Sequence, residues 1–213
     1  LVVGLLALLT YRNYWNARQL DVRTKQPELQ SLRARIRTNF LFNTLQNSAA
    51  LVHARPDEAE RVLLDLADLF RAALRGPERV PLAKDVELTR RYLEIESLRF
   101  GDRLRVHWRL PDELPDVLVP TLSIQPLVEN AIRHGVEPSV TGGTIDIDVH
   151  VDPARVQIII ANDLPRSGAI ATSGHSVGLA SARARIRALS LERGDLEARV
   201  EDGRFVATIT LPR

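Results

Sequence analysis

The sequence of 213 residues contains no cysteine, which excludes disulfides, zinc–thiolate centres and cysteine nucleophiles. It also has no large excess of charge of one sign, because 29 Lys and Arg stand against 27 Asp and Glu. This near balance is not typical of a nucleic-acid-binding protein, so we expect no nucleic acid as partner. Internal repeats and low-complexity segments are absent. The composition, 45% hydrophobic and 26% charged, indicates a folded body of one or two domains.

The apolar stretch at the start, residues 1–9, is shorter than the roughly 20 residues that a membrane-spanning helix needs. Tyr11, Tyr14 and Trp15 follow it, and residues 1–54 carry a net charge of +5 while the remainder carries −3. Aromatic and then basic residues are typical of the cytoplasmic edge of a membrane helix. We therefore predict that residues 1–11 end a truncated transmembrane helix of the inner (cytoplasmic) membrane. Residues 12–30 would be a juxtamembrane linker, with everything after about residue 15 cytoplasmic; an ordinary buried N-terminal helix is the alternative.

Two amphipathic helices are predicted next. The first runs from about Glu28 to Ala54, and the second begins with Asp57 as its cap, with Glu60 completing a capping box, and stops at Gly76. The apolar face of the second helix comprises Ala59, Val62, Leu63, Leu66, Phe70, Ala73 and Leu74. One helical hairpin has too little surface to bury both faces. We therefore predict that residues 31–80 form a four-helix bundle in a homodimer.

The pattern changes after a third predicted helix at about residues 82–99. Apolar residues then alternate with polar ones in five segments, which predicts strands with one buried face. These segments cover residues 104–110, 145–151, 156–160, 196–200 and 205–211. Helices are predicted between them at about residues 123–134 and 179–190. The expected fold class is therefore α+β: a helical hairpin followed, over residues 81–213, by an α/β two-layer sandwich.

One short helical stretch, residues 125–135, carries residues suited to a metal–nucleotide. Glu129 and Asn130 are adjacent, and Arg133 lies one turn further on, so all three can reach one bound object. An amide oxygen is a ligand for Mg²⁺, a carboxylate can accept a proton, and Arg or His can face phosphate. By spacing alone, a solvated helix face explains the same residues.

Residues 127–135, Leu-Val-Glu-Asn-Ala-Ile-Arg-His-Gly, are similar to the N-box of the ATP-binding domain of histidine kinases, in the form found in the LytS/YehU (AlgZ-like) family. Residues 32–45 resemble the phosphoacceptor segment of that family, and residues 92–100 resemble the helix that joins its two domains. Residues 174–186 look like the glycine box over the nucleotide phosphates. The resemblance implies an ATP-binding domain of the Bergerat (GHKL) type that uses ATP and Mg²⁺. It also implies a homodimer, and a response regulator receiver domain as partner.

By this resemblance Glu129 polarises the attacking imidazole or accepts its proton, and Asn130 holds Mg²⁺. The residues that it implies in nucleotide binding are Asn130, Arg133, His134, Gly135, Asn162, Asp163, Gly174, Ser176, Gly178 and Leu179. The glycines would let the backbone approach phosphate, with Leu179 beginning a helix whose N-terminus faces it. Arg183 and Arg185 are either further phosphate contacts or a solvated helix face.

The sequence departs from the family pattern at two places. After the strand that ends at Ile160, Asn162 takes the position of the Asp that reads adenine, with Asp163 as the second candidate. Asn39 stands where the family has its phosphoacceptor His, and Thr38 replaces a Pro. An amide nitrogen is not a nucleophile at neutral pH, so we expect no autophosphorylation at Asn39.

These features predict a sensor histidine kinase of a two-component system, which passes the γ-phosphoryl group of ATP to a His of the hairpin and then to a response regulator. The alternative is a nucleotide-binding pseudokinase that signals without phosphotransfer. A Bergerat-type ATPase that only hydrolyses ATP is less consistent with the segment Phe40-Leu41-Phe42-Asn43.

Overall fold

The computed structural model describes residues 38–164, 175–191 and 193–213, without the side chains of residues 38 and 175–178. The predicted membrane-helix end (1–11), the linker (12–30), the start of the hairpin (31–37) and Gly174 lie outside the described residues. The chain divides into two units, residues 1–42 and 43–213, and each is described by itself. In the described part of the chain, no helix combines the length and the hydropathy that are needed to cross a membrane.

The first two described helices are α2 (Thr38–Leu51) and α3 (Pro56–Arg75), and α3 ends before Gly76 as expected. The predicted cap at Asp57 is wrong. Arg55 takes the N-cap position without a side-chain hydrogen bond, and Pro56 begins the helix. Proline suits this place because its ring presets φ and the missing N–H would have no helical partner there. Asp57 therefore lies within the first turn, where its charge interacts favourably with the helix dipole.

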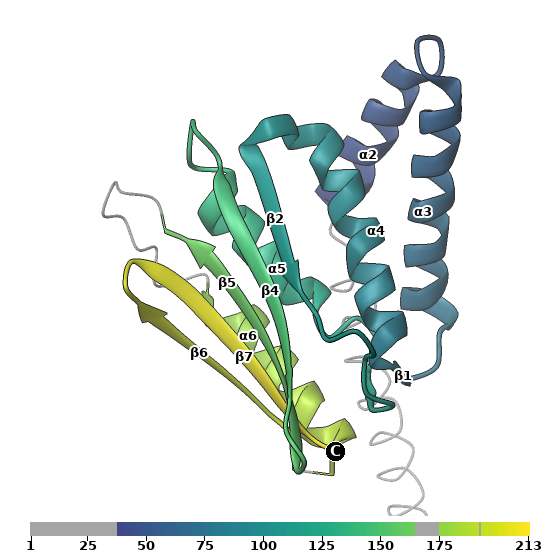
Figure 1. The fold of residues 1–213 in the computed structure, drawn as a ribbon. Helices are drawn as coiled ribbons and strands as arrows, with labels where there is room; N and C mark the ends of the chain where they lie inside the picture. Colours follow the sequence, from purple (N-terminus) through teal and green to yellow (C-terminus); the bar gives the residue numbers. More distant parts are fainter. Residues whose placement is uncertain (1–37, 165–174, 192) are drawn as a thin grey trace, which may run out of the picture. The chain divides into compact units, whose positions relative to one another are not determined.

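Helix α4 (Leu82–Phe100) matches the predicted third helix closely, and it packs against α3 (Figure 1). Leu66 and Leu69 of α3 are 5% and 1% exposed. The Nη1 atom of Arg91 on α4 donates to Asp65 at 2.8 Å and to Asp68 at 2.9 Å. The apolar face of α3 is therefore split: one part is buried within this chain, and another part remains exposed at Leu63, Leu64 and Leu74.

A five-stranded sheet forms the second layer of residues 81–213. Its strands are β2 (Leu104–Arg109), β4 (Gly143–Val151), β5 (Arg155–Asp163), β6 (Asp195–Glu201) and β7 (Arg204–Pro212). Their spatial order is β2-β4-β5-β7-β6; β2 pairs with β4 in parallel, and all other pairs are antiparallel. A small antiparallel ladder joins β1 (Arg79–Pro81) to β3 (Leu118–Pro120). Three residues with a proline are too short for periodicity to reveal, so this ladder was not predicted.

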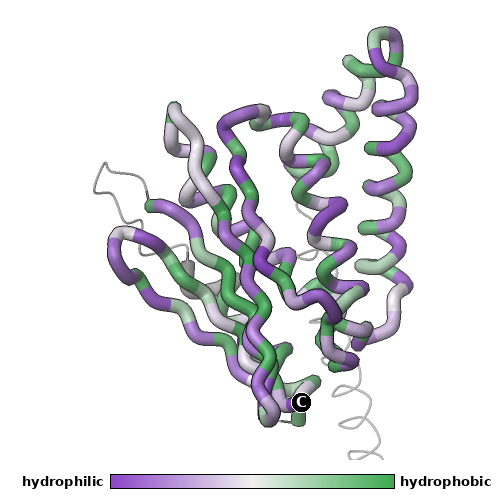
Figure 2. The backbone as a smooth tube through the Cα atoms, viewed as in Figure 1, coloured by the Kyte–Doolittle hydropathy of each residue, from purple (hydrophilic) through white to green (hydrophobic). Residues whose placement is uncertain are grey.

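Helices α5 (Gln125–Ala131) and α6 (His175–Leu189) lie along one face of the sheet (Figure 1), which confirms the two-layer sandwich. Hydrophobic segments run along the central strands in Figure 2. The fully buried side chains of this core are those that the alternation predicted: Ile145, Ile147, Ile158, Ile160, Ile209 and Leu211. On the edge strand β6 the alternation holds less well, because Leu196 is buried but Val200 is 52% exposed.

Candidate nucleotide site

Helix α5 continues into a π-helical turn, η2 (Ile132–Val136), and the two together are called the N-box segment below. The N–H of Glu137 donates to the carbonyl of Ile132 at 2.9 Å, which is the i to i+5 bond of a π-turn. Short π-helical turns are rare and occur frequently at functional sites. A helix was predicted over residues 123–134 with Gly135 at its end. The structure instead places Gly135 inside the wide turn, one residue before the segment stops.

The polar residues of the N-box segment differ in exposure. Glu129, Asn130 and His134 are half-buried, whereas Arg133 is exposed. The Nε2 atom of Gln125 donates to Oε1 of Glu129 at 2.9 Å, which orients the carboxylate along the helix. The Nδ2 atom of Asn130 is buried and has no hydrogen-bond partner among the described residues. An unpaired buried donor is costly, and this is the pattern that a site has when a ligand group completes it.

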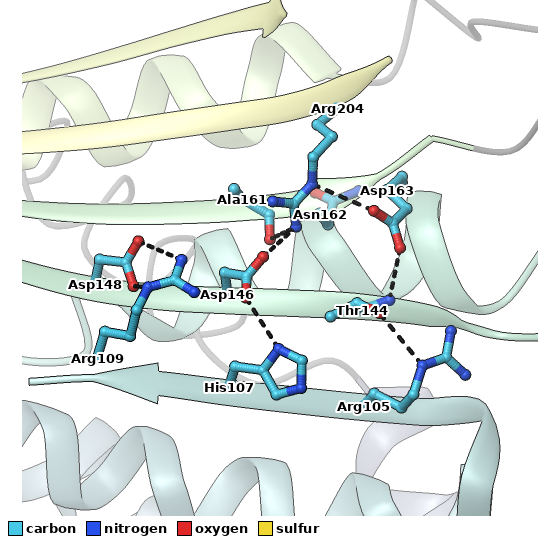
Figure 3. A network of polar contacts seen from close by, with 10 residues as sticks. All are labelled: Arg105, His107, Arg109, Thr144, Asp146, Asp148, Ala161, Asn162, Asp163 and Arg204. Atoms are coloured by element: carbon cyan, nitrogen blue, oxygen red, sulfur yellow. Dashed lines mark hydrogen bonds and ion pairs between the residues drawn. The ribbon is translucent and has the colours of Figure 1, made fainter. Parts of the chain in front are cut away.

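The end of β5 settles which of two neighbouring residues faces the N-box segment. Consecutive side chains on a strand point to opposite faces. Asn162 is 1% exposed, and a Cβ atom added to Gly135 would lie 2.7 Å from its Nδ2 atom. Asp163 points the other way, where its Oδ2 atom accepts from the N–H of Thr144 at 3.1 Å and Oδ1 pairs with Arg204 at 3.2 Å (Figure 3). Asn162, not Asp163, therefore lies on the N-box side.

Only one of the two polar atoms of the Asn162 amide has a hydrogen-bond partner among the described residues. Its Nδ2 atom donates to the carbonyl of Asp163 at 2.8 Å. Its Oδ1 atom is buried and receives no hydrogen bond from any described residue. This leaves a buried acceptor beside Gly135, at a place where only a glycine lets the backbone of the π-turn come so close. A donor on a bound ligand would satisfy it, because an amide oxygen can accept two hydrogen bonds.

The outer face of the sheet carries a polar network that the sequence did not reveal (Figure 3). Asp146 of β4 lies at its centre and contacts Arg204, His107 and Arg109. Burial by itself would raise the pKa of Asp146, but the hydrogen bond and charge of Arg204, together with His107 and Arg109, hold it below its usual value. His107 and His150 are both exposed. The network joins β2, β4, β5 and β7, and through Arg204 it keeps Asp163 on this face.

A second group of ionisable residues from α4 lies near Glu129. The hydroxyl of Tyr92 donates to Glu96 at 3.4 Å, and Arg99 donates to Glu96 at 2.8 Å and to Glu137 at 2.9 Å. Burial raises the pKa of Tyr92 well above its usual value, and the charges of Glu96 and Glu129 raise it further. The Tyr92 phenol is therefore neutral, and it is a donor that lies within electrostatic reach of Glu129.

The predicted phosphate loop falls only partly within the described residues. Helix α6 begins at His175, not at Leu179, so Ser176 and Gly178 lie in its first turn. A single glycine costs a helix only about 1 kcal/mol relative to alanine, so Gly178 does not stop it. Leu179 is half-buried. Arg183 pairs with Asp195 at 3.1 Å and keeps 44% of its side chain exposed. Arg185 is not on a solvated face, because it donates to the carbonyl of Leu122 at 2.6 Å.

The phosphoacceptor position is at the start of α2, where Asn39 is exposed. His53 follows the end of this helix at Leu51 and is also exposed. Helix α2 therefore ends at Leu51, before the predicted end at Ala54. No group of three or more His, Asp or Glu side chains converges to hold a metal ion in the part of the chain that the structure describes.

The fold is a mixed sheet covered by helices on one face, with a buried polar site at the end of a strand. Among solved structures, the catalytic domain of the histidine kinase ThkA superposes with a TM-score of 0.50 at 18% identity, covering 63% of this chain and 95% of that domain. At this identity the likeness concerns the fold alone. The fold is that of a histidine kinase catalytic domain.

The family follows from the sequence comparisons. Residues 27–104 match the family model described as histidine kinase. The chain is 29% identical to the sensor histidine kinase YpdA of Escherichia coli over 208 residues, which is 89% of this chain and 35% of YpdA. It is 37% identical to the sensor histidine kinase/phosphatase LytS of Staphylococcus aureus over 141 residues, which is 65% of this chain and 24% of LytS.

The family model and these relatives support a LytS-like histidine kinase with a GHKL-type catalytic domain, as the N-box resemblance implied. It spans about a quarter to a third of the length of these relatives.

Proposed function

We propose that the ATP-binding region, residues 81–213, binds ATP with Mg²⁺ between the N-box segment, the end of β5 and the first turn of α6. The observation that carries this proposal is the buried, unsatisfied Oδ1 atom of Asn162 beside Gly135. Its carbonyl-type oxygen suits the amino group of adenine, as a neutral acceptor weaker than a carboxylate. The N–H groups at the start of α6 suit phosphate because they have no partner within the helix.

Asn130 supports the metal assignment. Mg²⁺ is usually held by one or two protein groups together with substrate phosphates and water, so a site need not contain a cluster of carboxylates. The Asn130 side chain is half-buried one residue after Glu129, and its Nδ2 atom lacks a partner in the described part of the chain. In this arrangement the amide oxygen faces the metal, and Glu129, oriented by Gln125, accepts a proton or positions a nucleophile. Arg133 and His134 face the phosphates.

In the whole protein, we assign this chain to the cytoplasmic part of an inner-membrane sensor kinase of a two-component system. Residues 1–11 would end the last membrane helix, residues 12–30 would connect it, and residues 31–80 would form the dimerisation hairpin. The exposed apolar side chains of this region support a homodimer: Leu45, Val52, Leu63, Leu64 and Leu74. The receiver domain of a response regulator would be the partner for phosphotransfer.

The residue at position 39 favours a second candidate function. The exposed side chain of Asn39 is an amide, and an amide nitrogen cannot attack the γ-phosphorus as imidazole does. A chain that binds nucleotide but cannot accept its phosphoryl group would act as a pseudokinase, in which ATP only stabilises one conformation of a signalling module. The two candidates share the nucleotide site and differ in the chemistry at this one position.

Titration calorimetry with ATP, with and without Mg²⁺, tests the site. We expect binding that requires Mg²⁺ and falls in the variant Asn130→Asp, where a second carboxylate beside Glu129 disturbs the metal and repels phosphate. The control is Asp163→Asn, because Asp163 lies on the other face of the sheet; its affinity for ATP should stay near that of the unchanged protein. Equal affinities of the unchanged protein and Asn130→Asp would remove the Mg²⁺ assignment.

A further inference from the structure

The N-box segment has no cap of its own at its start. The N-cap position of α5 is Ile124, no side chain of the segment caps it, and its first turn contains no acidic residue. The carboxylate of Asp85 on α4, distant in the sequence, instead binds the backbone of the turn that leads into the segment. It is fully buried and accepts from three successive backbone N–H groups, those of Leu122 at 2.5 Å, Ser123 at 3.1 Å and Ile124 at 3.1 Å. The hydroxyl of Ser123 donates a fourth hydrogen bond at 3.0 Å.

Helix α6 also contacts the turn that Asp85 binds, through Arg185 and Leu122. Leu122 has a φ of 58°, a conformation that a leucine adopts only under constraint from its surroundings. Its N–H binds Asp85, and its carbonyl accepts from Nη2 of Arg185 at 2.6 Å. Burial raises the pKa of Asp85, while the bonds from Ile124, Ser123 and Leu122 and the charge of Arg185 oppose that rise. Helix α4, the N-box segment and the helix after the phosphate loop therefore meet at one buried carboxylate.

Helix α4 also contacts the other end of the N-box segment. Arg99, in its last turn, pairs with Glu137 at 2.9 Å. Arg103, just after α4, donates to the carbonyls of Val136 and Ser139 at 3.3 and 2.8 Å. Both ends of the segment that carries Glu129 and Asn130 are thus bound to α4 and to the turn that follows it.

We propose that Asp85 is a positioning residue for the nucleotide site, which fixes the N-box segment relative to α4 so that Glu129 and Asn130 stand correctly for ATP and Mg²⁺. The proposal rests on the proposed function of this site. Asp85 does not contact the ligand; it acts through the backbone of residues 122–124. Because Arg91 of α4 in turn binds Asp65 and Asp68 of α3, a displacement of α3 and α4 is transmitted to the nucleotide site through Asp85.

The test compares the 213-residue chain with the variant Asp85→Asn, which keeps the shape but replaces one of the two accepting oxygens by an NH₂ group that cannot accept from the backbone N–H groups. We expect the dissociation constant for ATP and Mg²⁺ to rise about tenfold or more, the effect that losing an orienting partner has at metal sites. Amide hydrogen exchange should accelerate in residues 122–136. The matched control is Val156→Ala, a core truncation in the same domain. It lies about 20 Å from Asn162 along β5, so it lowers the thermal midpoint without touching the N-box segment.

Two results would overturn the proposal: an affinity of Asp85→Asn within twofold of the unchanged chain, or an equal loss in Val156→Ala at the same thermal midpoint. If Asp85→Asn does not fold, the variant Ser123→Ala replaces it, because it removes only one of the hydrogen bonds to Asp85. Ser123→Ala should weaken ATP binding two- to threefold, and unchanged binding counts against the proposal. If the unchanged chain binds no nucleotide, the proposed function fails. Exchange in the free protein then still decides: acceleration confined to residues 122–136 supports positioning by Asp85, and uniform acceleration refutes it.

Discussion

Replacing Gly135 by alanine tests the close approach between the N-box segment and β5. The added Cβ atom would lie 2.7 Å from Nδ2 of Asn162 and 2.7 Å from the carbonyl oxygen of Asp163, distances that Cβ atoms do not show in folded proteins. In a helical turn without such neighbours, alanine is more favourable than glycine by about 1 kcal/mol. Overpacking costs about 1–3 kcal/mol, and here one of the two obstacles is backbone that cannot rotate away. The steric cost therefore exceeds the gain in helix propensity.

We expect Gly135→Ala to lower the thermal midpoint by several degrees, because about 1 kcal/mol shifts it by 2–4 °C in a domain of this size. The affinity for ATP should fall as well, since relief of the clash must move Asn162 or the π-turn. Circular dichroism on heating measures the first effect, and calorimetry measures the second. An unchanged or higher thermal midpoint would refute the packing argument.

The matched control is Gly101→Ala. Gly101 has a φ of 53°, and a Cβ atom there meets nothing within 4 Å, so this change adds backbone strain without a clash. It should destabilise the fold through backbone strain alone, by about 1–3 kcal/mol. In the background Asn162→Ala, the cost of Gly135→Ala should decrease but not vanish, because the carbonyl of Asp163 remains. A cost that is the same in both backgrounds would show that the two side chains do not interact.

Two further predictions concern the hairpin. The unchanged chain should form no acid-labile phosphohistidine with radiolabelled ATP. The variant Asn39→His should form it, alone or with Thr38→Pro to bend the helix, whereas the control Asn39→Gln should not. Phosphate mapped to another histidine of the unchanged chain would contradict this prediction. Leu64 is 59% exposed on α3, so Leu64→Glu should weaken the homodimer by about 1.5–3 kcal/mol, as measured by sedimentation. Leu66 is buried within the chain, so Leu66→Glu should unfold the protein instead. A monomeric unchanged chain would exclude the bundle.

Periodicity was enough to predict most elements of this fold. Ile145, Ile147, Ile158 and Ile160 alternate with polar residues because a strand that buries one face places an apolar side chain at every second position. Helix ends were predicted less well. At Asp57 the sequence offered a good cap, but the helix begins at Pro56, two residues earlier than that cap would place it. Local preferences compete at such positions, and the pattern does not show which preference prevails.

For the candidate site, the sequence alone identified the N-box residues Glu129 and Asn130, through a contiguous motif whose spacing puts them on one helix. It placed Asn162 before Asp163 as the residue that reads adenine, on the alignment alone. The tertiary structure shows which side chain faces the N-box segment, since the pleat of β5 turns the two side chains to opposite faces and the side chain of Asn162 lies against Gly135.

Asp85 shows most clearly what only the tertiary structure could decide. Its spacing from Leu82 and Tyr92 places it on the buried face of α4, which marks it as an unusual acid but names no partner. Its partners are backbone N–H groups 37 to 39 positions away, and every residue type except proline can supply a backbone N–H. A contact of this kind leaves no side-chain pattern in the sequence. It exists only because the chain folds residues 122–124 back onto α4, where a buried carboxyl group needs hydrogen-bond partners.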